Sequence, residues 1–258
     1  MERRSRRERP HGRAGHGGVI AVLFFAASAM AGVEFQSADV RALQADDFAN
    51  PGMLWVTKGE RAWREPVATG AACQSCHGEA SKSMKGVAAA YPKFDATIGR
   101  VVNLDERIEA CRRVNQKAPA LPAESEERLV LSAFVAHQSR GLPIQVSIDG
   151  LAKATFDRGA ALYFTRAGQL NLACTHCHDR AWGKTLLNET ISQGQPEGWP
   201  AYRLEWQSLA SLQRRLRACF YGVRAEQPPF GDPDLVALEL YLAHRAKGLP
   251  MSVPGVRR

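Results

Sequence analysis

The sequence contains few methionines and no long apolar segment. Five methionines occur among 258 residues, and only Met53, Met84 and Met251 lie beyond the first 31. Outside the N-terminus, no apolar run reaches the roughly 18 residues that a membrane-spanning helix needs. Low-complexity segments are also missing, and hydrophobic residues make up 45% of the chain against 23% charged residues. This composition excludes disorder, collagen and coiled coils, and it predicts one large or two ordinary globular domains.

A large excess of positive charge is missing from most of the chain. The formal net charge is +8, but the first 31 residues hold six arginines and two glutamates, which is half of it. Lysine and arginine elsewhere are mixed with aspartate and glutamate. We therefore predict no nucleic-acid partner, because such partners require a concentrated basic patch.

The N-terminus has the composition of a secretory signal peptide, predicted over residues 1–31. Six arginines precede an apolar stretch at residues 18–29, and Ala29-Met30-Ala31 provides the small residues of a cleavage site. An amphipathic or membrane anchor is the alternative. Ser5-Arg6-Arg7 matches a twin-arginine motif only in part. Cleavage would place the mature chain in the periplasm, without a membrane span.

Two C-x-x-C-H motifs, about 100 residues apart, are the strongest signal in the chain. This pentapeptide is typical of c-type haem attachment: two thiols form thioethers with the haem vinyl groups, and the histidine binds iron. Zinc binding, a redox dithiol and a plain disulfide are the alternatives. The chain thus predicts two covalent c-type haems. The motif residues are Cys73, Cys76 and His77, then Cys174, Cys177 and His178.

The sequence around each motif repeats. Gly59-Glu-Arg-Ala-Trp63 precedes the first motif and Gly159-Ala-Ala-Leu-Tyr163 the second; each begins an amphipathic helix. Residues 134–143 resemble residues 241–250, where apolar helical spacing ends in Gly and Pro. We therefore predict an all-α fold, a tandem of two class I cytochrome c-like domains at 50–145 and 150–258, connected by residues 144–155.

The two remaining cysteines occupy equivalent places in the repeats. Leu104-Asp-Glu-Arg-Ile-Glu-Ala-Cys111 corresponds to Leu212-Gln-Arg-Arg-Leu-Arg-Ala-Cys219. In a class I domain this zone supplies a methionine to the iron, yet no methionine lies there in both halves. We therefore predict that Cys111 and Cys219 are thiolate ligands, which favour ferric iron.

Other readings of these cysteines remain open. The oxidising compartment favours a Cys111–Cys219 disulfide, and free cysteines are often inert and buried. His137 and His244 are rival iron ligands, although their places near helix ends favour surface or core roles. His176, inside the second motif, is assigned no role.

Two C-x-x-C-H motifs, each followed by a cysteine in the distal zone, resemble the SoxA family. The similarity covers nearly the whole mature chain and is clearest at residues 212–219, 223–226 and 238–248. SoxA is the dihaem cytochrome subunit of the SoxAX complex of periplasmic sulfur oxidation. The family's activity is L-cysteine S-thiosulfotransferase, which joins thiosulfate oxidatively to a cysteine of the carrier protein SoxYZ. Electrons leave through the partner cytochrome SoxX.

The resemblance also implies roles for individual residues. His77 and Cys111 would ligate the first haem iron, and His178 and Cys219 the second. Cys219 would be the catalytic residue, present as a persulfide. Some family members lack the first haem motif, whereas this chain has it, so two haems are implied.

The thiosulfate dianion requires cations beside the reacting sulfur. Arg215 lies four residues before Cys219 and shares its helix face, whereas Arg217 points to the opposite side. The family also has an arginine here, and Arg215 is therefore the candidate substrate-binding residue. Two rival functions are a non-catalytic dihaem electron-transfer cytochrome and a dihaem peroxidase, and neither calls for paired distal cysteines.

Overall fold

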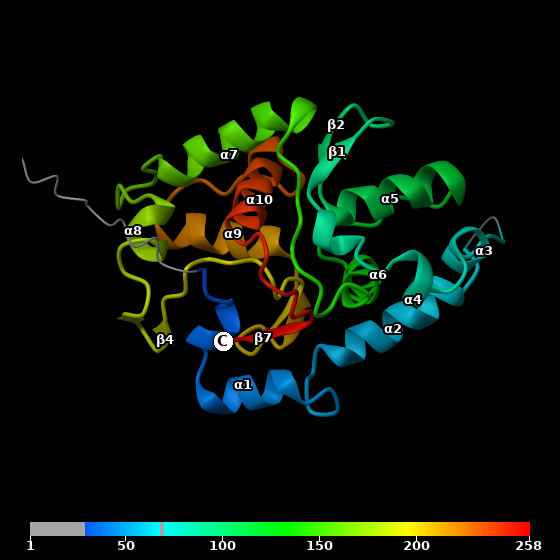
Figure 1. Ribbon diagram of the computed structural model, residues 1–258, viewed down its shortest axis with the longest axis horizontal. Helices are drawn as coiled ribbons and strands as arrows, with labels where there is room; N and C mark the ends of the chain where they lie inside the picture. Colours follow the sequence, from blue (N-terminus) through cyan, green and yellow to red (C-terminus); the bar gives the residue numbers. More distant parts are fainter. Residues whose placement is uncertain (1–28, 68–69) are drawn as a thin grey trace, which may run out of the picture.

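The computed structural model describes residues 29–67 and 70–258 (Figure 1). Of the predicted signal peptide only residues 29–31 fall within this part; the rest lies outside the described residues. In the described part no helix is long and apolar enough to cross a membrane. The short elements are η1 (Gly32–Phe35), α1 (Ala38–Ala45), α3 (Cys73–His77), α4 (Ala80–Ser83), η2 (Ala88–Ala90), η3 (Gly150–Ala152), α8 (Cys174–His178), β3 (Thr185–Leu186) and β4 (Glu189–Thr190).

Two pairs of crossing helices form the framework, as the sequence repeat predicts (Figure 1). Gly59 and Gly159 lie at the crossings: a Cβ atom at either position would come within 2.0 Å of a carbonyl oxygen, of Val130 or of Ala237. Only glycine permits this approach of two backbones. The pairs are α2 (Met53–Arg64) with α6 (Glu126–His137), and α7 (Lys153–Phe164) with α10 (Pro233–Arg245).

A small antiparallel hairpin precedes each cysteine-bearing helix. In each case the helix has a side-chain N-cap, because Asn103 accepts a hydrogen bond from the Glu106 amide and Ser211 accepts one from the Arg214 amide. The cap fixes where the helix begins, and therefore where its eighth residue, a cysteine, is placed. The elements are β1 (Lys93–Asp95), β2 (Arg100–Val102), α5 (Leu104–Asn115), β5 (Ala201–Arg203), β6 (Ser208–Ala210) and α9 (Leu212–Gly222).

The all-α prediction is correct for the helices but omits seven short strands. Two hairpins and a three-stranded sheet of order β6-β5-β7 are present, with β7 (Gly255–Arg257) parallel to β5. Each strand is only two or three residues long. Such strands are too short to show an alternating pattern, which explains why sequence reasoning finds no sheet.

The predicted connection at 144–155 is part of the core. Ile144 and Val146 are buried in one apolar cluster with Ala88 and Val101 from the first half and Leu240 from the second. The Ile144 amide donates to the Leu249 carbonyl, and the Gly248 amide donates back to Ile144. The two halves therefore share a core, and this connection is not a loose linker.

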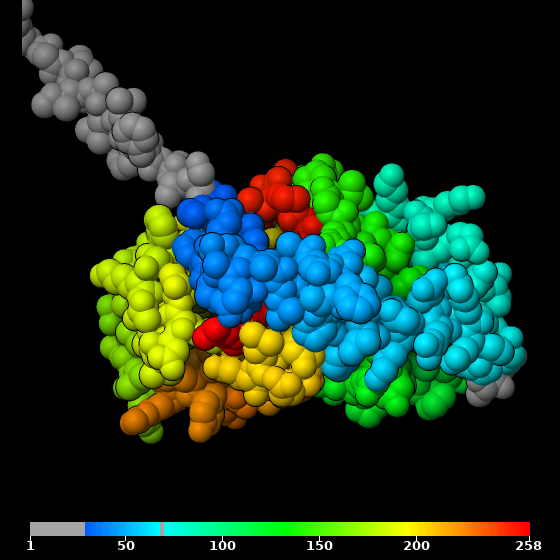
Figure 2. Space-filling model, turned by 90° about the horizontal axis from the view of Figure 1, so that it is seen from below, coloured from blue at the N-terminus to red at the C-terminus, as the bar shows by residue number. Residues whose placement is uncertain are grey.

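The chain ends also connect the halves. Helix α1 and the 3₁₀ turn η1 pack against the C-terminal strand β7. In Figure 2 the blue N-terminal segment lies against the red C-terminal one. Gln44 of α1 is buried and accepts a hydrogen bond from the Val256 amide. The N-terminal segment thus belongs structurally with the C-terminal sheet.

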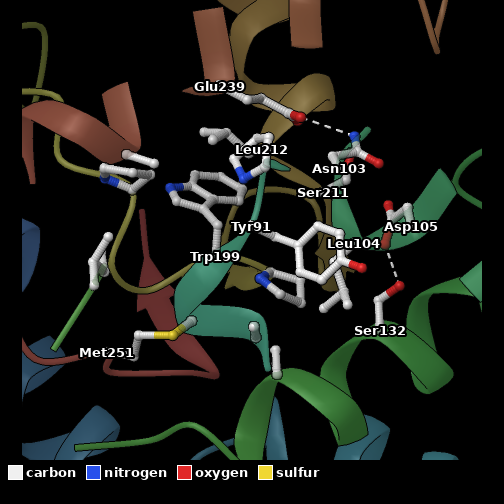
Figure 3. Close-up of a pocket in the computed structure, with 17 residues that line it drawn as sticks. Tyr91, Asn103, Leu104, Asp105, Ser132, Trp199, Ser211, Leu212, Glu239 and Met251 are labelled. Atoms are coloured by element: carbon white, nitrogen blue, oxygen red, sulfur yellow. Dashed lines mark hydrogen bonds between the residues drawn. The ribbon is translucent and has the colours of Figure 1, made fainter. Parts of the chain in front are cut away.

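A cavity of about 110 Å³ lies where the halves meet (Figure 3). None of the six cysteines is among its lining residues. Glu239 of α10 projects into it, is 5% exposed, and accepts a hydrogen bond of 2.8 Å from Asn103, the N-cap of α5. Asp105 is hydrogen-bonded to Ser132 at the same cavity. Burial, together with the charges of Asp105 and Glu106, raises the pKa of Glu239 to about 8.

We predict that Glu239 makes stability depend on pH. A carboxyl group whose pKa is raised from 4.5 to about 8 contributes fully below pH 4.5, and its contribution is lost as the pH rises to 8. The loss is roughly 5 kcal/mol. Glu239→Gln should remove this dependence in denaturant unfolding between pH 4.5 and 8, whereas Glu226→Gln, at an exposed position, should preserve it. An unchanged slope in the Glu239 variant would contradict the prediction.

Candidate haem-binding and thiol site

A loop of the second half, which contains Ser192 and Gly194, contacts the histidine of the second motif. His178 ends the short helix α8, and its Nδ1 lies 2.7 Å from the Ser192 carbonyl oxygen. Donation from Nδ1 fixes the ring and leaves the other ring nitrogen as a potential metal ligand. Gly194, at φ 74°, lies against the imidazole: a Cβ there would be 3.1 Å from the ring. The glycine thus lets the backbone of this loop approach the imidazole ring closely.

Cys219 of α9 lies beside this histidine. Burial alone would raise the pKa of its thiol, but the Arg215 guanidinium, a hydrogen bond with His178 and the charge of Arg203 lower it to about 7. At neutral pH a large share of this sulfur is therefore thiolate, the form that binds metals and acts as a nucleophile. The structure thus brings the two predicted ligands of the second haem iron together.

The two thiols of the second motif also face Cys219. Burial and the charge of Cys219 raise the pKa of Cys174 to about 11, and the same two effects raise that of Cys177. Four groups from two helices, 41 residues apart in sequence at their closest, thus converge on one space. A c-type haem requires this set, two thiols for its vinyl groups and two iron ligands on opposite sides, so the residues fit the group.

The first motif has the same arrangement in a more open form. The pKa of Cys73 is raised by burial and by the charge of Cys111 on α5, and the Gln116 amide lies 3.7 Å from the Cys73 sulfur. Cys76 and His77 are exposed. The Trp63 ring centroid lies 5.6 Å from that of His77. The structure thus places all four predicted first-haem residues at one end of α2 and α5.

An aromatic residue in the helix before each motif, Trp63 or Tyr163, forms a hydrogen bond with the residue directly after the motif's histidine. Trp63 donates from Nε1 to the Gly78 carbonyl at 3.1 Å, and the Tyr163 hydroxyl donates to the Asp179 carboxylate at 2.8 Å. Arg245 also binds Asp179, at 2.7 Å. These contacts explain why the sequence repeat includes an aromatic residue in the first helix.

Helices α5 and α9 have a surface suited to covering a large apolar group. On α5 only Arg112 is buried, and on α9 only Gln213, although both helices carry apolar side chains such as Ile108 and Leu216. By contrast, eight consecutive residues of α6 and nine of α10 are buried. No disulfide joins any two of the six cysteines, all of which lie in the described part of the chain. The alternative of a Cys111–Cys219 disulfide is therefore wrong, since each of these cysteines lies beside its own motif.

The repeat places an arginine four residues before each distal cysteine, but the two arginines have different neighbours. Arg107, four before Cys111, forms a 3.1 Å ion pair with Asp95 at the end of β1. The position equivalent to Asp95, at the end of β5, is Arg203. The charge of Arg215 lowers the pKa of Arg203, after the larger effect of burial, because the two guanidinium groups face each other. An arginine–carboxylate pair therefore stands at the first site where two arginines lie close together at the second.

Arg203 is the functional candidate that sequence reasoning missed. It is 5% exposed, and its Nε has no hydrogen-bond partner within the described part of the chain. Glu205 and Glu189 pair with its terminal nitrogens at 3.0 and 3.5 Å, and its guanidinium stacks on Trp206. Aligning the two repeats from their cysteines back through the strands would have shown an arginine opposite an aspartate.

Other residues considered from the sequence make contacts that do not involve Cys111 or Cys219. Arg217 donates to the Pro228 carbonyl and stacks on Phe230, so it points away from Cys219, as predicted. His244 packs edge-on against Phe156, with ring centroids 4.9 Å apart. His137 is half-buried at the end of α6. His176 accepts a hydrogen bond from the Ala173 amide at 3.0 Å and thereby caps its own short helix.

Comparison with known proteins agrees with the cytochrome c-like fold and with the resemblance found in the sequence. Residues 58–144 match the family model of the SoxA/TsdA cytochrome c domain. The chain is 39% identical to the L-cysteine S-thiosulfotransferase subunit SoxA of Pseudaminobacter salicylatoxidans, over 89% of this chain and 81% of the relative. It is 38% identical to SoxA of Rhodovulum sulfidophilum, over 88% and 79%. The crystal structure of SoxXA from P. pantotrophus matches with a TM-score of 0.85 and 33% identity, covering 89% of this chain and 87% of that one.

The fold and the motif chemistry define a c-type cytochrome, a protein that carries covalently attached haem c. More particularly, the chain belongs to the SoxA family, the subunits of L-cysteine S-thiosulfotransferase.

Proposed function

We propose that the chain binds two haems in tandem cytochrome c-like domains, residues 50–145 and 150–258. His77 and Cys111 would hold the first haem iron, and His178 and Cys219 the second. The repeated order of helix, motif, hairpin, cysteine-bearing helix and final helix supports this assignment. The hydrogen bond between Cys219 and His178 and the proximity of Cys73 to Cys111 support the two pairings.

The chain acts in thiosulfate oxidation as an L-cysteine S-thiosulfotransferase subunit, and Cys219 is its reacting sulfur, carried as a persulfide. The overall reaction joins a carrier thiol to the outer sulfur of thiosulfate, and one proton and two electrons are lost as the sulfur–sulfur bond forms. Haem, when bound, accepts one electron at a time. The observation that carries the proposal is the position of Cys219, whose thiol has a pKa of about 7 beside Arg215.

Arg215 and Arg203 together form the anion site. Arg215 lies on the cysteine's side of α9, and Arg203 faces it from the end of β5. Two forked guanidinium groups suit the sulfonate end of thiosulfate, because each can donate two parallel hydrogen bonds to oxygens. The first site lacks this pair, since Asp95 occupies the place of Arg203. This difference supports catalysis at the second site and a structural or electron-storing role at the first.

The partners follow from the named relatives. One solved relative is a SoxXA complex, and we propose a SoxX-type monohaem cytochrome as the partner that takes the electrons. A SoxYZ-type carrier presents the acceptor cysteine. The predicted signal peptide supports a periplasmic location, where both partners would meet the mature chain.

The haem count is the first test. Mass spectrometry of the exported, mature protein should show two covalent haem additions, because each C-x-x-C-H motif supplies two thiols. Replacing both cysteines of the first motif by alanine should leave one addition. A wild-type protein with a single addition would contradict the two-haem proposal.

The division of labour between the distal cysteines is the second test. Cys219→Ser should abolish thiosulfate-dependent electron release, measured with the carrier and a cytochrome acceptor, because the reacting sulfur is lost. Cys111→Met should shift the spectrum of the first haem yet leave substantial activity. Equal losses in the two variants would argue against separate roles.

The anion site gives the third test. Arg215→Ala should lower kcat/KM for thiosulfate by about one to two orders of magnitude, the cost of a lost charge-assisted contact. Arg203→Ala should also lower it while both haem spectra persist, and Arg215→Lys should recover part of the loss. Arg217→Ala is the matched control on the same helix and should be mild. A larger loss in Arg217→Ala than in Arg215→Ala would refute the assignment.

A further inference from the structure

The 3₁₀ turn at the start of the described chain is bound to a buried carboxylate. The Gly32 backbone nitrogen lies 2.7 Å from Oε1 of Glu197. Glu197 is 0% exposed, and its second oxygen, Oε2, has no hydrogen-bond partner in the described part of the chain. A buried carboxylate oxygen without a donor is costly, because it has lost water and gained nothing in return. This oxygen therefore indicates a missing donor.

The candidate cleavage site lies at the same point. Ala29-Met30-Ala31 has small residues at both positions that a signal peptidase reads, and the next residue is Gly32. Hydrolysis of the Ala31–Gly32 bond consumes one water molecule. Ala31 leaves with a new carboxylate, and the Gly32 amide nitrogen becomes an α-amino group that takes up a proton. The nitrogen atom that already lies beside Glu197 would then carry three N–H donors and a positive charge.

We propose that the mature chain begins at Gly32 and that its α-ammonium group forms a buried ion pair with Glu197. This inference rests on the proposed export and processing of the chain. One amide hydrogen can serve only Oε1, whereas an ammonium group can reach both oxygens. A Cβ at Gly32 would lie 3.2 Å from Oε1 and 3.5 Å from Oε2 of Glu197, so both oxygens are close to this residue.

The surrounding charges are consistent with a second cation at Glu197. Arg257 of β7 pairs with Oε1 at 3.0 Å, but its other terminal nitrogen is bound to Gln44 and to the Val256 carbonyl. Burial raises the pKa of Glu197, and the charge of Arg257 together with the backbone amides of Glu197, Gly32 and Val33 opposes this only in part. The competing carboxylate is Glu34, which accepts from the Ala31 amide at 3.1 Å in an exposed position. Glu197 is favoured because burial strengthens an ion pair that solvent would screen at Glu34.

Processing would also change the surroundings of His178. Ala29 lines a cavity of about 270 Å³ together with His178, Gln195 and Arg245. Cleavage removes Ala29 from this cavity. The new N-terminus would pair with Glu197, on the segment whose Ser192 carbonyl holds the His178 ring. The mature N-terminus would therefore hold in place the segment that orients His178.

The experiment measures where the exported protein begins and how its N-terminal amine reacts. The full-length chain is produced in a bacterial host that exports it and attaches haem c, and the mature terminus is identified by mass spectrometry. An amine-acylating ester is then applied at neutral pH to native and to denatured protein. We expect a chain beginning at Gly32 whose native amine reacts about tenfold or more slowly than the denatured one, because it is buried and charged. Any other first residue, or equal reaction rates, would overturn the proposal.

Variants distinguish the ion pair from simple burial. Glu197→Gln should bring the native acylation rate of the Gly32 amine close to the denatured rate and lower Tm by about 5 °C. Glu34→Gln, at the competing carboxylate, should change neither. If Glu197→Gln does not accumulate, one extra glycine inserted after Ala31 serves instead, because it moves the amine by about 3.5 Å. An amine as protected in the extended chain as in the wild type would refute the pairing.

Failure of the proposed function would look different. Haem additions and thiosulfate-dependent electron release are measured on the same wild-type sample. A protected Gly32 amine in a protein with one haem, or without activity, would refute the function and leave the N-terminal pairing intact.

Discussion

The structure depends on two places where helix backbones touch. At Gly59 and Gly159 a side chain of any size would collide with the carbonyl oxygen of the facing helix. These contacts set the crossing of α2 with α6 and of α7 with α10. Trp63 of α2 and Tyr163 of α7 then form hydrogen bonds with the residue that follows each C-x-x-C-H motif. The hairpins and N-caps then set where α5 and α9 begin. The placement of a C-x-x-C-H motif beside a second cysteine therefore follows from one packing rule used twice.

The two sites differ in the charge of one equivalent residue, Asp95 in the first half and Arg203 in the second. Both halves have an arginine four residues before the distal cysteine, so the helix alone would make the sites alike. At the first site Asp95 neutralises Arg107; at the second, Arg203 adds a cation beside Arg215. The pKa of Cys219 is accordingly lowered to about 7, despite burial. The same two guanidinium groups that favour the Cys219 thiolate are thus the ones that distinguish the second half from the first.

The sequence predicted what is local and repeated, and missed what depends on contacts between distant segments. The motifs, the helix pairs, the convergence of Cys219 with His178 and the orientation of Arg217 follow from spacing along the chain. The strands do not, because two or three residues show no periodicity. Arg203 was missed because only the folded structure shows that it lies close to Arg215, twelve residues later in the chain. The buried connection at Ile144 and Val146 was expected to be a linker, because no local pattern shows that both halves pack against it.

Burying the charged guanidinium of Arg203 is unfavourable, and contacts from neighbouring segments offset part of this free-energy cost. Burial lowers the pKa of Arg203, so holding its charge in β5 is unfavourable by itself. Glu205 and Glu189 compensate in part, Trp206 covers one face of the guanidinium, and the strand on the far side is β7, fastened by Gln44 and by the pair of Arg257 with Glu197. The N-terminal segment therefore packs against β7, and β7 pairs with β5, which carries Arg203. Glu197 thus pairs with a residue of β7, the strand that is hydrogen-bonded to β5, and β5 carries Arg203.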